Sequence, residues 1–191
     1  MTFSIPRNAG QIPVFYNHRF GSGYVREPNP GLLKGGYVDS DDAPLYPFGY
    51  GLSYTNFEIS DYQSSKKEVE GDGDVEISVK VKNTGNRKGD EVVQLYTSFF
   101  HTGVTRPVQE LRGFKRVTLE SGEEKRVVFS LSMRQLGYYD SQMDFSVEPG
   151  TLNIMIGNKA GDYPVKETID IIGEKKVVKD NRVYTCPVRV E

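Results

Sequence analysis

The stretch from Val75 to Lys82 constrains the fold more than any other part of the sequence, because apolar and polar residues alternate through it without interruption. One face of such an extended segment carries Val75, Ile77, Val79 and Val81. The other face carries Glu76, Ser78, Lys80 and Lys82. Successive side chains of a strand point to opposite faces, so we expect a β-strand with one face in a core and the other in water. This arrangement is typical of antiparallel sheets.

Further strands are expected along the rest of the chain, with little room for helices. The strand-like segments are residues 92–100, 112–119, 125–131, 150–157 and 166–172, most of them bounded by Gly, Ser or Pro. Only residues 133–136 indicate a helical turn. Many short strands in this order predict an all-β protein, an antiparallel two-sheet sandwich. Residues 177–190 are expected to add a hairpin that turns at residues 179–181.

Residues 43–55, APLYPFGYGLSYT, form a segment of unusual composition, which we call the aromatic segment. It contains Pro44, Pro47, Gly49 and Gly51 together with the rings of Tyr46, Phe48, Tyr50 and Tyr54. Flexible linkers carry few aromatic side chains, so we expect this segment to be held on a packed surface. Strand-like alternation starts directly after it, which indicates that a domain begins there.

Residues 1–42 cannot close a hydrophobic core of their own. Residues 12–16, Ile-Pro-Val-Phe-Tyr, are expected to form one short buried strand, and the residues from there to Gly36 are rich in Gly, Pro and Asn. About forty residues with so little secondary structure need a larger body to lie on. We therefore interpret this region as the remnant of a domain whose main part lies upstream.

Several motifs resemble the family-3 glycoside hydrolases, which include β-glucosidases and β-xylosidases. PLYPFGYGLSYTNF resembles the segment that ends their second domain, and FSIPRNAGQIPVFYNHR is similar to the last strand and exit loop of that α/β-sandwich domain. Three later blocks are similar, in the same order, to the fibronectin type III-like domain that closes many of these enzymes. These blocks are VEISVKVKNTGNRKGDEVVQLYTS, TRPVQELRGFKRVTLESGEEKRVVFSLS and VEPGTLNIMIG. The likeness covers roughly residues 3–160.

The resemblance implies four regions. Residues 1–42 would be the remnant of the α/β-sandwich domain, and residues 43–55 the aromatic segment that connects it to the next domain. Residues 56–173 would form the fibronectin type III-like, immunoglobulin-like β-sandwich. Residues 174–191 would be a C-terminal extension, for which the family offers no pattern.

No catalytic, cofactor-binding or metal-binding residue is expected in the chain. The adjacent pairs Asp41-Asp42 and Glu123-Glu124 lie in loop-like sequence and lack the separation that glycosidase carboxylates need. The resemblance implies a nucleophilic aspartate and an acid/base glutamate, both upstream of the matched region, so the chain alone should be inactive. His18 and His101 lie in different segments without a cysteine partner, which argues against a metal site.

Ten residues are candidates for docking or for family motifs. They are Tyr46, Pro47, Phe48, Gly49, Tyr50, Gly51, Tyr54, Arg106, Glu110 and Arg112. The expected partners are the remaining barrel and α/β-sandwich domains of a parent hydrolase, with self-association through exposed rings as a further option. Some of the four aromatic rings should be exposed or folded back onto the sandwich. Arg106, Glu110 and Arg112 are expected either to form ion pairs that hold the domains together or to form a solvated surface network.

The charge balance excludes some partners. With 24 Lys and Arg against 26 Asp and Glu, the chain has no basic surface for nucleic acid, and no apolar run is long enough to span a membrane.

The sequence itself shows no targeting signal, whereas the resemblance implies a periplasmic or secreted parent. Cys186 is expected to be a packed, strand-borne thiol. An alternative function is a free-standing carbohydrate-binding or protein-interaction module, although the chain has no Trp.

Overall fold

The computed structural model describes residues 1–19, 40–99 and 102–191, and this part of the chain is built from β-strands and short 3₁₀ turns. The first seven strands are β1 (Phe57–Ser64), β2 (Glu68–Glu70), β3 (Asp74–Asn83), β4 (Gly89–Phe99), β5 (Glu110–Leu119), β6 (Glu124–Ser132) and β7 (Tyr138–Tyr139). The others are β8 (Phe145–Val147), β9 (Gly150–Gly157), β10 (Val165–Ile172), β11 (Lys176–Val177) and β12 (Val188–Val190). The 3₁₀ turns are η1 (Ala9–Gln11), η2 (Met133–Leu136) and η3 (Lys179–Asn181).

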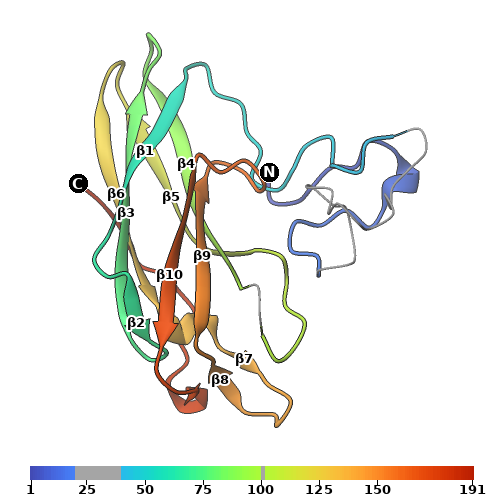
Figure 1. The fold of residues 1–191 in the computed structure, drawn as a ribbon. Coiled ribbons are helices and arrows are strands. Elements are labelled where there is room, and N and C mark those ends of the chain that lie inside the picture. The colour runs from blue at the N-terminus through green and yellow to red at the C-terminus, as the bar shows by residue number, and fades with distance from the viewer. Residues whose placement is uncertain (20–39, 100–101) are drawn as a thin grey trace.

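Two sheets face each other to form a sandwich (Figure 1). One sheet has the strand order β1-β3-β6-β12, and the other has the order β2-β10-β9-β4-β5. All pairings in them are antiparallel except that of β2 with β10, which is parallel. A small third sheet, β11-β8-β7, covers one end of the sandwich. The N-terminal residues and the aromatic segment lie beside the sandwich (Figure 1).

The core between the sheets confirms the alternation that predicts β3. Val75, Ile77, Val79 and Val81 are at most 2% exposed. They pack in one cluster with inward-facing residues of the opposite sheet, including Leu95, Leu152, Ile154 and Ile156. The predicted all-β, two-sheet sandwich is therefore confirmed. The helical turn predicted at residues 133–136 is also present, as η2.

Two predicted elements are wrong. Residues 12–16 form no strand, and Ile12 and Phe15 are 65% and 47% exposed, since no neighbouring strand in the described part of the chain pairs with them. Residues 177–190 form no hairpin, because β11 pairs with β8 while β12 pairs with β6. The segment is divided in this way because each half satisfies the backbone groups at the edge of a different sheet.

Cys186 lies just before β12 rather than on a strand. Its thiol is half-buried, and a Cβ placed at Gly113 would lie 3.1 Å from the Cys186 Cβ and 3.2 Å from Phe129 Cδ1. Burial raises the pKa of the Cys186 thiol to about 11, so little thiolate forms near neutral pH. The prediction of a packed thiol is confirmed, and its placement on a strand is wrong.

Candidate docking site at the aromatic segment

The aromatic segment lies between the N-terminal residues and one end of the sandwich. Its backbone pairs with the N-terminal residues, because the Ile5 amide donates to the Tyr46 carbonyl at 2.8 Å and the Gly49 amide donates to the Met1 carbonyl at 2.8 Å. On the other side, the Ala160 amide donates to the Phe48 carbonyl at 2.8 Å. Ala160 belongs to the loop that joins β9 to β10. The segment thus connects the N-terminal region to the sandwich through main-chain hydrogen bonds.

A stack of aromatic rings strengthens this junction. The Tyr16 ring lies on the Phe48 ring with centroids 4.3 Å apart, and it also meets the Tyr96 ring at 5.9 Å with an edge-to-face geometry. Tyr96, on β4, also contacts Tyr163 at 5.3 Å. Tyr96 is completely buried. Rings at these separations attract each other beyond the effect of burial alone, so the N-terminal region is packed onto β4 and not merely adjacent to it.

Two glutamines complete the junction. Gln109 Nε2 donates to the Tyr16 carbonyl at 2.8 Å, and the Tyr163 hydroxyl donates to Gln109 Oε1. Gln94, on β4, accepts from the Tyr96 hydroxyl and donates to the Asn158 carbonyl. Both glutamine side chains are buried, and these bonds satisfy their amide groups.

Gly49 is required at its position for two reasons. Its φ of +83° lies in the left-handed region, and a Cβ there would lie 2.5 Å from the Gln94 side-chain oxygen. Gly51 differs, because nothing lies within 4 Å of a Cβ placed there. Of the two candidate glycines, the structure explains only the first.

Residues beyond Tyr16 continue along the sandwich. The Val108 amide donates to the His18 carbonyl at 2.8 Å, and Arg19 forms an antiparallel bridge with Pro107. The Arg19 guanidinium also donates to the Thr105 carbonyl. The N-terminal region therefore runs beside residues 105–109, which lead into β5.

Arg106, Glu110 and Arg112 form one ion cluster at the start of β5. Glu110 Oε2 accepts from the Arg106 guanidinium at 2.8 Å and from the Arg112 guanidinium at 2.7 Å. The side chains of Arg106 and Arg112 are 7% and 11% exposed, so the expected ion pairs exist but the interpretation as a solvated surface network is wrong. The two guanidinium groups are further bound by the Leu136 and Gln135 carbonyls, which compensates for their desolvation.

Aromatic rings and buried groups surround the positive charges of the cluster. The Arg106 guanidinium lies over the Phe99 and Tyr138 rings, at 4.9 and 4.7 Å from their centroids. Burial lowers the pKa of Arg112 and raises that of Tyr16, whose phenol meets the Leu111 backbone. Burial, together with a hydrogen bond to Glu148, raises the pKa of the Tyr138 hydroxyl. The cluster is an internal support for the loop before β5.

Exposure divides the candidate docking residues into two groups. Pro47, Phe48, Gly49 and Tyr50 are half-buried against the N-terminal residues and the sandwich. Tyr46 is 38% exposed and packs on Tyr50 with ring centroids 4.8 Å apart. Tyr54 is 93% exposed and its neighbour Leu52 is 89% exposed. The prediction that some rings are folded back and others are exposed is confirmed, whereas a docking role remains a prediction.

Sequence reasoning missed the residues of the junction that lie outside the aromatic segment. Tyr16, Tyr96, Tyr163, Gln94 and Gln109 complete the junction, although they come from four separate parts of the chain. The one available signal was Gln94-Leu-Tyr96 within a predicted strand, because an interior strand position with a polar residue needs a hydrogen-bond partner.

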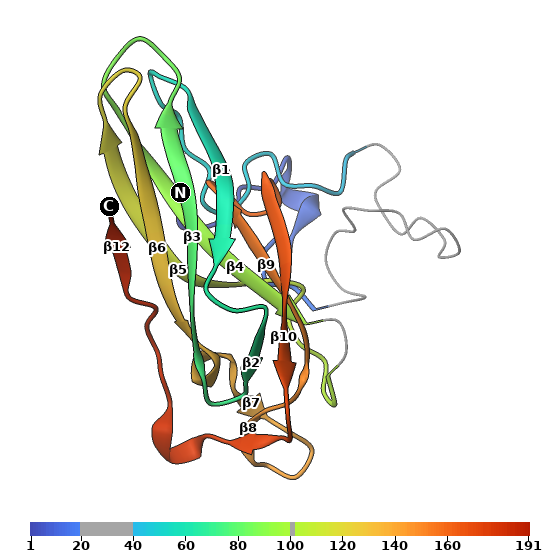
Figure 2. The same cartoon turned by 60° about the vertical axis from the view of Figure 1, so that its left-hand side comes forward.

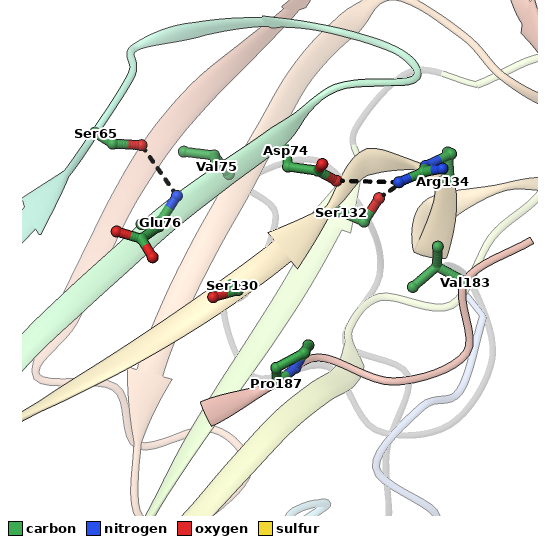
Figure 3. Close-up of a pocket in the computed structure, with 9 residues that line it drawn as sticks. All are labelled: Ser65, Asp74, Val75, Glu76, Ser130, Ser132, Arg134, Val183 and Pro187. Atoms are coloured by element: carbon green, nitrogen blue, oxygen red, sulfur yellow. Dashed lines mark hydrogen bonds and ion pairs between the residues drawn. The ribbon is translucent and has the colours of Figure 1, made fainter. Parts of the chain in front are cut away.

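Other kinds of functional site find less support among the described residues. No group of three or more potential metal ligands occurs among residues 1–19, 40–99 and 102–191, and His101 lies outside these ranges. No helix in the same residues is long and apolar enough to cross a membrane. A hollow of about 430 Å³ lies on the outer face of β3 and β6 and is bordered by Val183 and Pro187 (Figure 3).

Comparison with known proteins places this geometry in a family. Residues 91–160 match the fibronectin type III-like domain. A periplasmic β-glucosidase of Salmonella typhimurium is 41% identical over 157 residues, which cover 82% of this chain and 20% of the relative. A putative β-xylosidase of Formosa agariphila is 42% identical over 160 residues, which cover 84% of this chain and 20% of the relative.

Solved structures agree with these relatives. The β-glucosidase from Listeria innocua in complex with glucose superimposes with a TM-score of 0.79 and 34% identity, over 90% of this chain and 24% of that one. A β-glucosidase from Erythrobacter marinus gives a TM-score of 0.77 and 37% identity, over 88% of this chain and 21% of that one. The chain spans about a fifth of the length of the curated relatives that it matches. It therefore carries a fibronectin type III-like domain and is homologous to the C-terminal part of the family-3 β-glucosidases and β-xylosidases.

Proposed function

We propose that the chain is a non-catalytic accessory region of a β-glucosidase-like family-3 hydrolase, and that it docks against the barrel and α/β-sandwich domains of that enzyme. The observation that carries this proposal is the exposure of Leu52 and Tyr54, at 89% and 93%, in a segment whose neighbours are firmly fixed. Relatives about five times as long supply further domains that can cover these side chains.

The proposed docking surface has a fixed base, residues 46–50, and an exposed part, Leu52 and Tyr54. The hydrogen bonds of Gly49 and Ala160 and the Tyr16–Phe48 stack hold the base. Leu52 and Tyr54 lie two residues apart, before β1 and outside any strand, and both side chains are exposed to solvent. Burying one large apolar side chain contributes about 1.5–3 kcal/mol. Because the base of the surface is already ordered, docking of these two side chains would cost little additional ordering.

The reaction of the parent enzyme would be hydrolysis of β-linked glycosides, with both catalytic carboxylates on the upstream domains. In each of the two adjacent carboxylate pairs of this chain, one member forms an ion pair. Asp41 pairs with Arg7 at 3.3 Å, and Glu123 pairs with Lys125 at 3.0 Å. One relative is a periplasmic enzyme, which supports a periplasmic or secreted location for the parent.

Two assays test the proposal. The purified chain should not hydrolyse an aryl β-glucoside above the rate of a mock purification from the same host, and turnover that copurifies with the chain would contradict the non-catalytic role. In the full-length parent enzyme, the double change Leu52→Ser and Tyr54→Ser should lower the unfolding temperature and lead to earlier loss of activity on heating. Phe114→Ser is the matched control, because Phe114 is 63% exposed on β5.

The carbohydrate-binding alternative depends on the same residue. The exposed Tyr54 ring could stack on a sugar, so the isolated chain should be titrated with cello- and xylo-oligosaccharides by calorimetry. Saturable heat that Tyr54→Ser abolishes would favour a binding module over a docking surface. Self-association through the exposed rings would instead appear as a concentration-dependent mass that the same substitution reduces.

A further inference from the structure

The C-terminal segment, residues 174–191, joins two different sheets. β11 pairs with β8 in the small sheet at one end of the sandwich. β12 pairs with β6 and forms the edge of the sheet β1-β3-β6-β12. Figure 2 shows the segment passing below the sandwich and then rising along the outer side of β6. Without β12, β6 would be the edge strand of its sheet. An edge strand presents unpaired N–H and C=O groups that can accept another strand.

β12 recognises this edge through a few specific contacts. Val188, Arg189 and Val190 pair with Phe129, Val128 and Val127, and the amides and carbonyls of Arg126 and Glu191 exchange two hydrogen bonds of 2.8 Å. The Arg189 guanidinium reaches across β6 to both carboxylate oxygens of Glu76 on β3. Val188 and Val190 pack against the core. The last four residues therefore have the features of a strand-shaped ligand.

The connection to this strand-shaped ligand is irregular, and isolated contacts hold it, such as that of the Arg182 guanidinium over the Phe145 ring at 3.9 Å. Residues 182–187 belong to no strand or helix, and the Tyr184 side chain is 78% exposed. A hollow of about 430 Å³ lies where this stretch passes Ser130 and Ser132 of β6 (Figure 3). Arg134 and Asp74 border the same hollow and pair with each other at 3.5 Å. The segment thus crosses from one sheet to the other without regular strand pairing, and Cys186 and the Pro187 carbonyl, which accepts from the Ser130 amide at 2.9 Å, hold it against β6.

We propose that the outer edge of β6 is a strand-acceptor site and that the C-terminal strand of a second copy of this chain can occupy it, which gives dimers by exchange of residues 183–191. The contact is isologous, because each copy donates and accepts the same strand. In a single chain, the short linker holds β12 near its own site at an effective concentration on the order of millimolar. Self-pairing therefore dominates unless the linker is shortened or the copies are concentrated.

Shortening the linker provides the first test. Deleting Lys179–Asn181 removes η3 and shortens the connection between β11 and β12 by three residues, which should disfavour pairing of β12 with its own β6, whereas the strand of a second copy is not restricted in this way. Light scattering after gel filtration should show a dimer for this variant. The same variant lacking residues 183–191 should be a monomer, and replacement of Lys179–Asn181 by three glycines should leave the protein monomeric. A folded deletion variant that stays monomeric would overturn the proposal.

A second test does not depend on the folding of the deletion variant. A protease site placed at the exposed Tyr184 is cleaved in the folded, full-length protein, and a fluorescent peptide of residues 183–191 is added. The peptide should bind the cleaved protein saturably and the uncleaved protein at least about 10-fold more weakly, because the linker no longer favours the resident strand. Arg189→Ala in the peptide should weaken binding about 3- to 5-fold, as expected for an exposed ion pair. Absence of binding to the cleaved protein would refute the acceptor site.

Discussion

Tyr16→Ala should detach the N-terminal region from the sandwich without unfolding the sandwich. Tyr16 contributes two ring contacts, to Phe48 at 4.3 Å and to Tyr96 at 5.9 Å, each worth about 0.5–1.5 kcal/mol beyond burial. Its ring is half-buried, so truncation also loses about half of the 1.5–3 kcal/mol of a fully buried large side chain. The local opening free energy should fall by about 2–4 kcal/mol.

Amide hydrogen exchange measures this loss directly. The Val108, Gly49 and Ala160 amides donate to carbonyls in the N-terminal region or the aromatic segment, so they report on the junction. A loss of about 2–4 kcal/mol corresponds to exchange on the order of 30- to 700-fold faster at these amides. The Ile77 amide in the core strand β3 should keep its protection, because the sandwich core does not include Tyr16.

Tyr16→Phe is the matched control for this change. It preserves both ring contacts and removes only the hydroxyl near the Leu111 backbone, so junction exchange should rise less than about 10-fold. If Tyr16→Ala left the protection of Val108, Gly49 and Ala160 unchanged, the ring stack would not hold the junction. If the substitution lowered protection equally in β3, the junction and the sandwich would be one cooperative unit.

Three further outcomes follow from the same structure. A hydrogen bond from Lys175 lowers the pKa of Asp140 to about 2. The stability that this carboxylate contributes is therefore present above its unfolded pKa of about 3.9 and is lost as pH falls toward 2. Asp140→Asn should flatten that part of the pH dependence of the unfolding free energy, measured by urea unfolding. Gly49→Ala should cost about 1–3 kcal/mol in the same assay, whereas Gly51→Ala should be nearly neutral, and equal effects would refute the steric argument. Cys186, with its pKa raised to about 11, should react with a thiol reagent at pH 8 much more slowly in the folded than in the unfolded protein; equal rates would contradict its burial.

The local patterns of the sequence were sufficient for most of the strands. Alternation at residues 75–82 specifies which side chains of β3 enter the core, because a slip of one residue would place Glu76 and Lys80 there instead. The same reasoning predicts β4, β5, β6, β9 and β10 close to their observed bounds. These predictions succeed because side-chain alternation and turn residues act over a few positions.

The candidate site was predictable only in outline. The composition of residues 43–55 indicates a segment held on a surface, and the structure shows that surface to include Tyr16 and the β4 residue Tyr96. Nothing in the sequence distinguishes Phe48, which is half-buried, from Tyr54, which is 93% exposed. The difference depends on which ring meets Tyr16, and that contact joins residues far apart in the chain.

The sequence by itself determined the long strands, the inward face of β3 and the kinship with the C-terminal part of family-3 hydrolases, because these depend on neighbouring residues and on motif order. Tertiary structure alone decided three other features. It buried Arg106 and Arg112 around Glu110, packed Tyr16 against Phe48 and Tyr96, and placed β12 on the edge of β6. Each depends on partners distant in sequence, whose geometry exists only once the two sheets have packed.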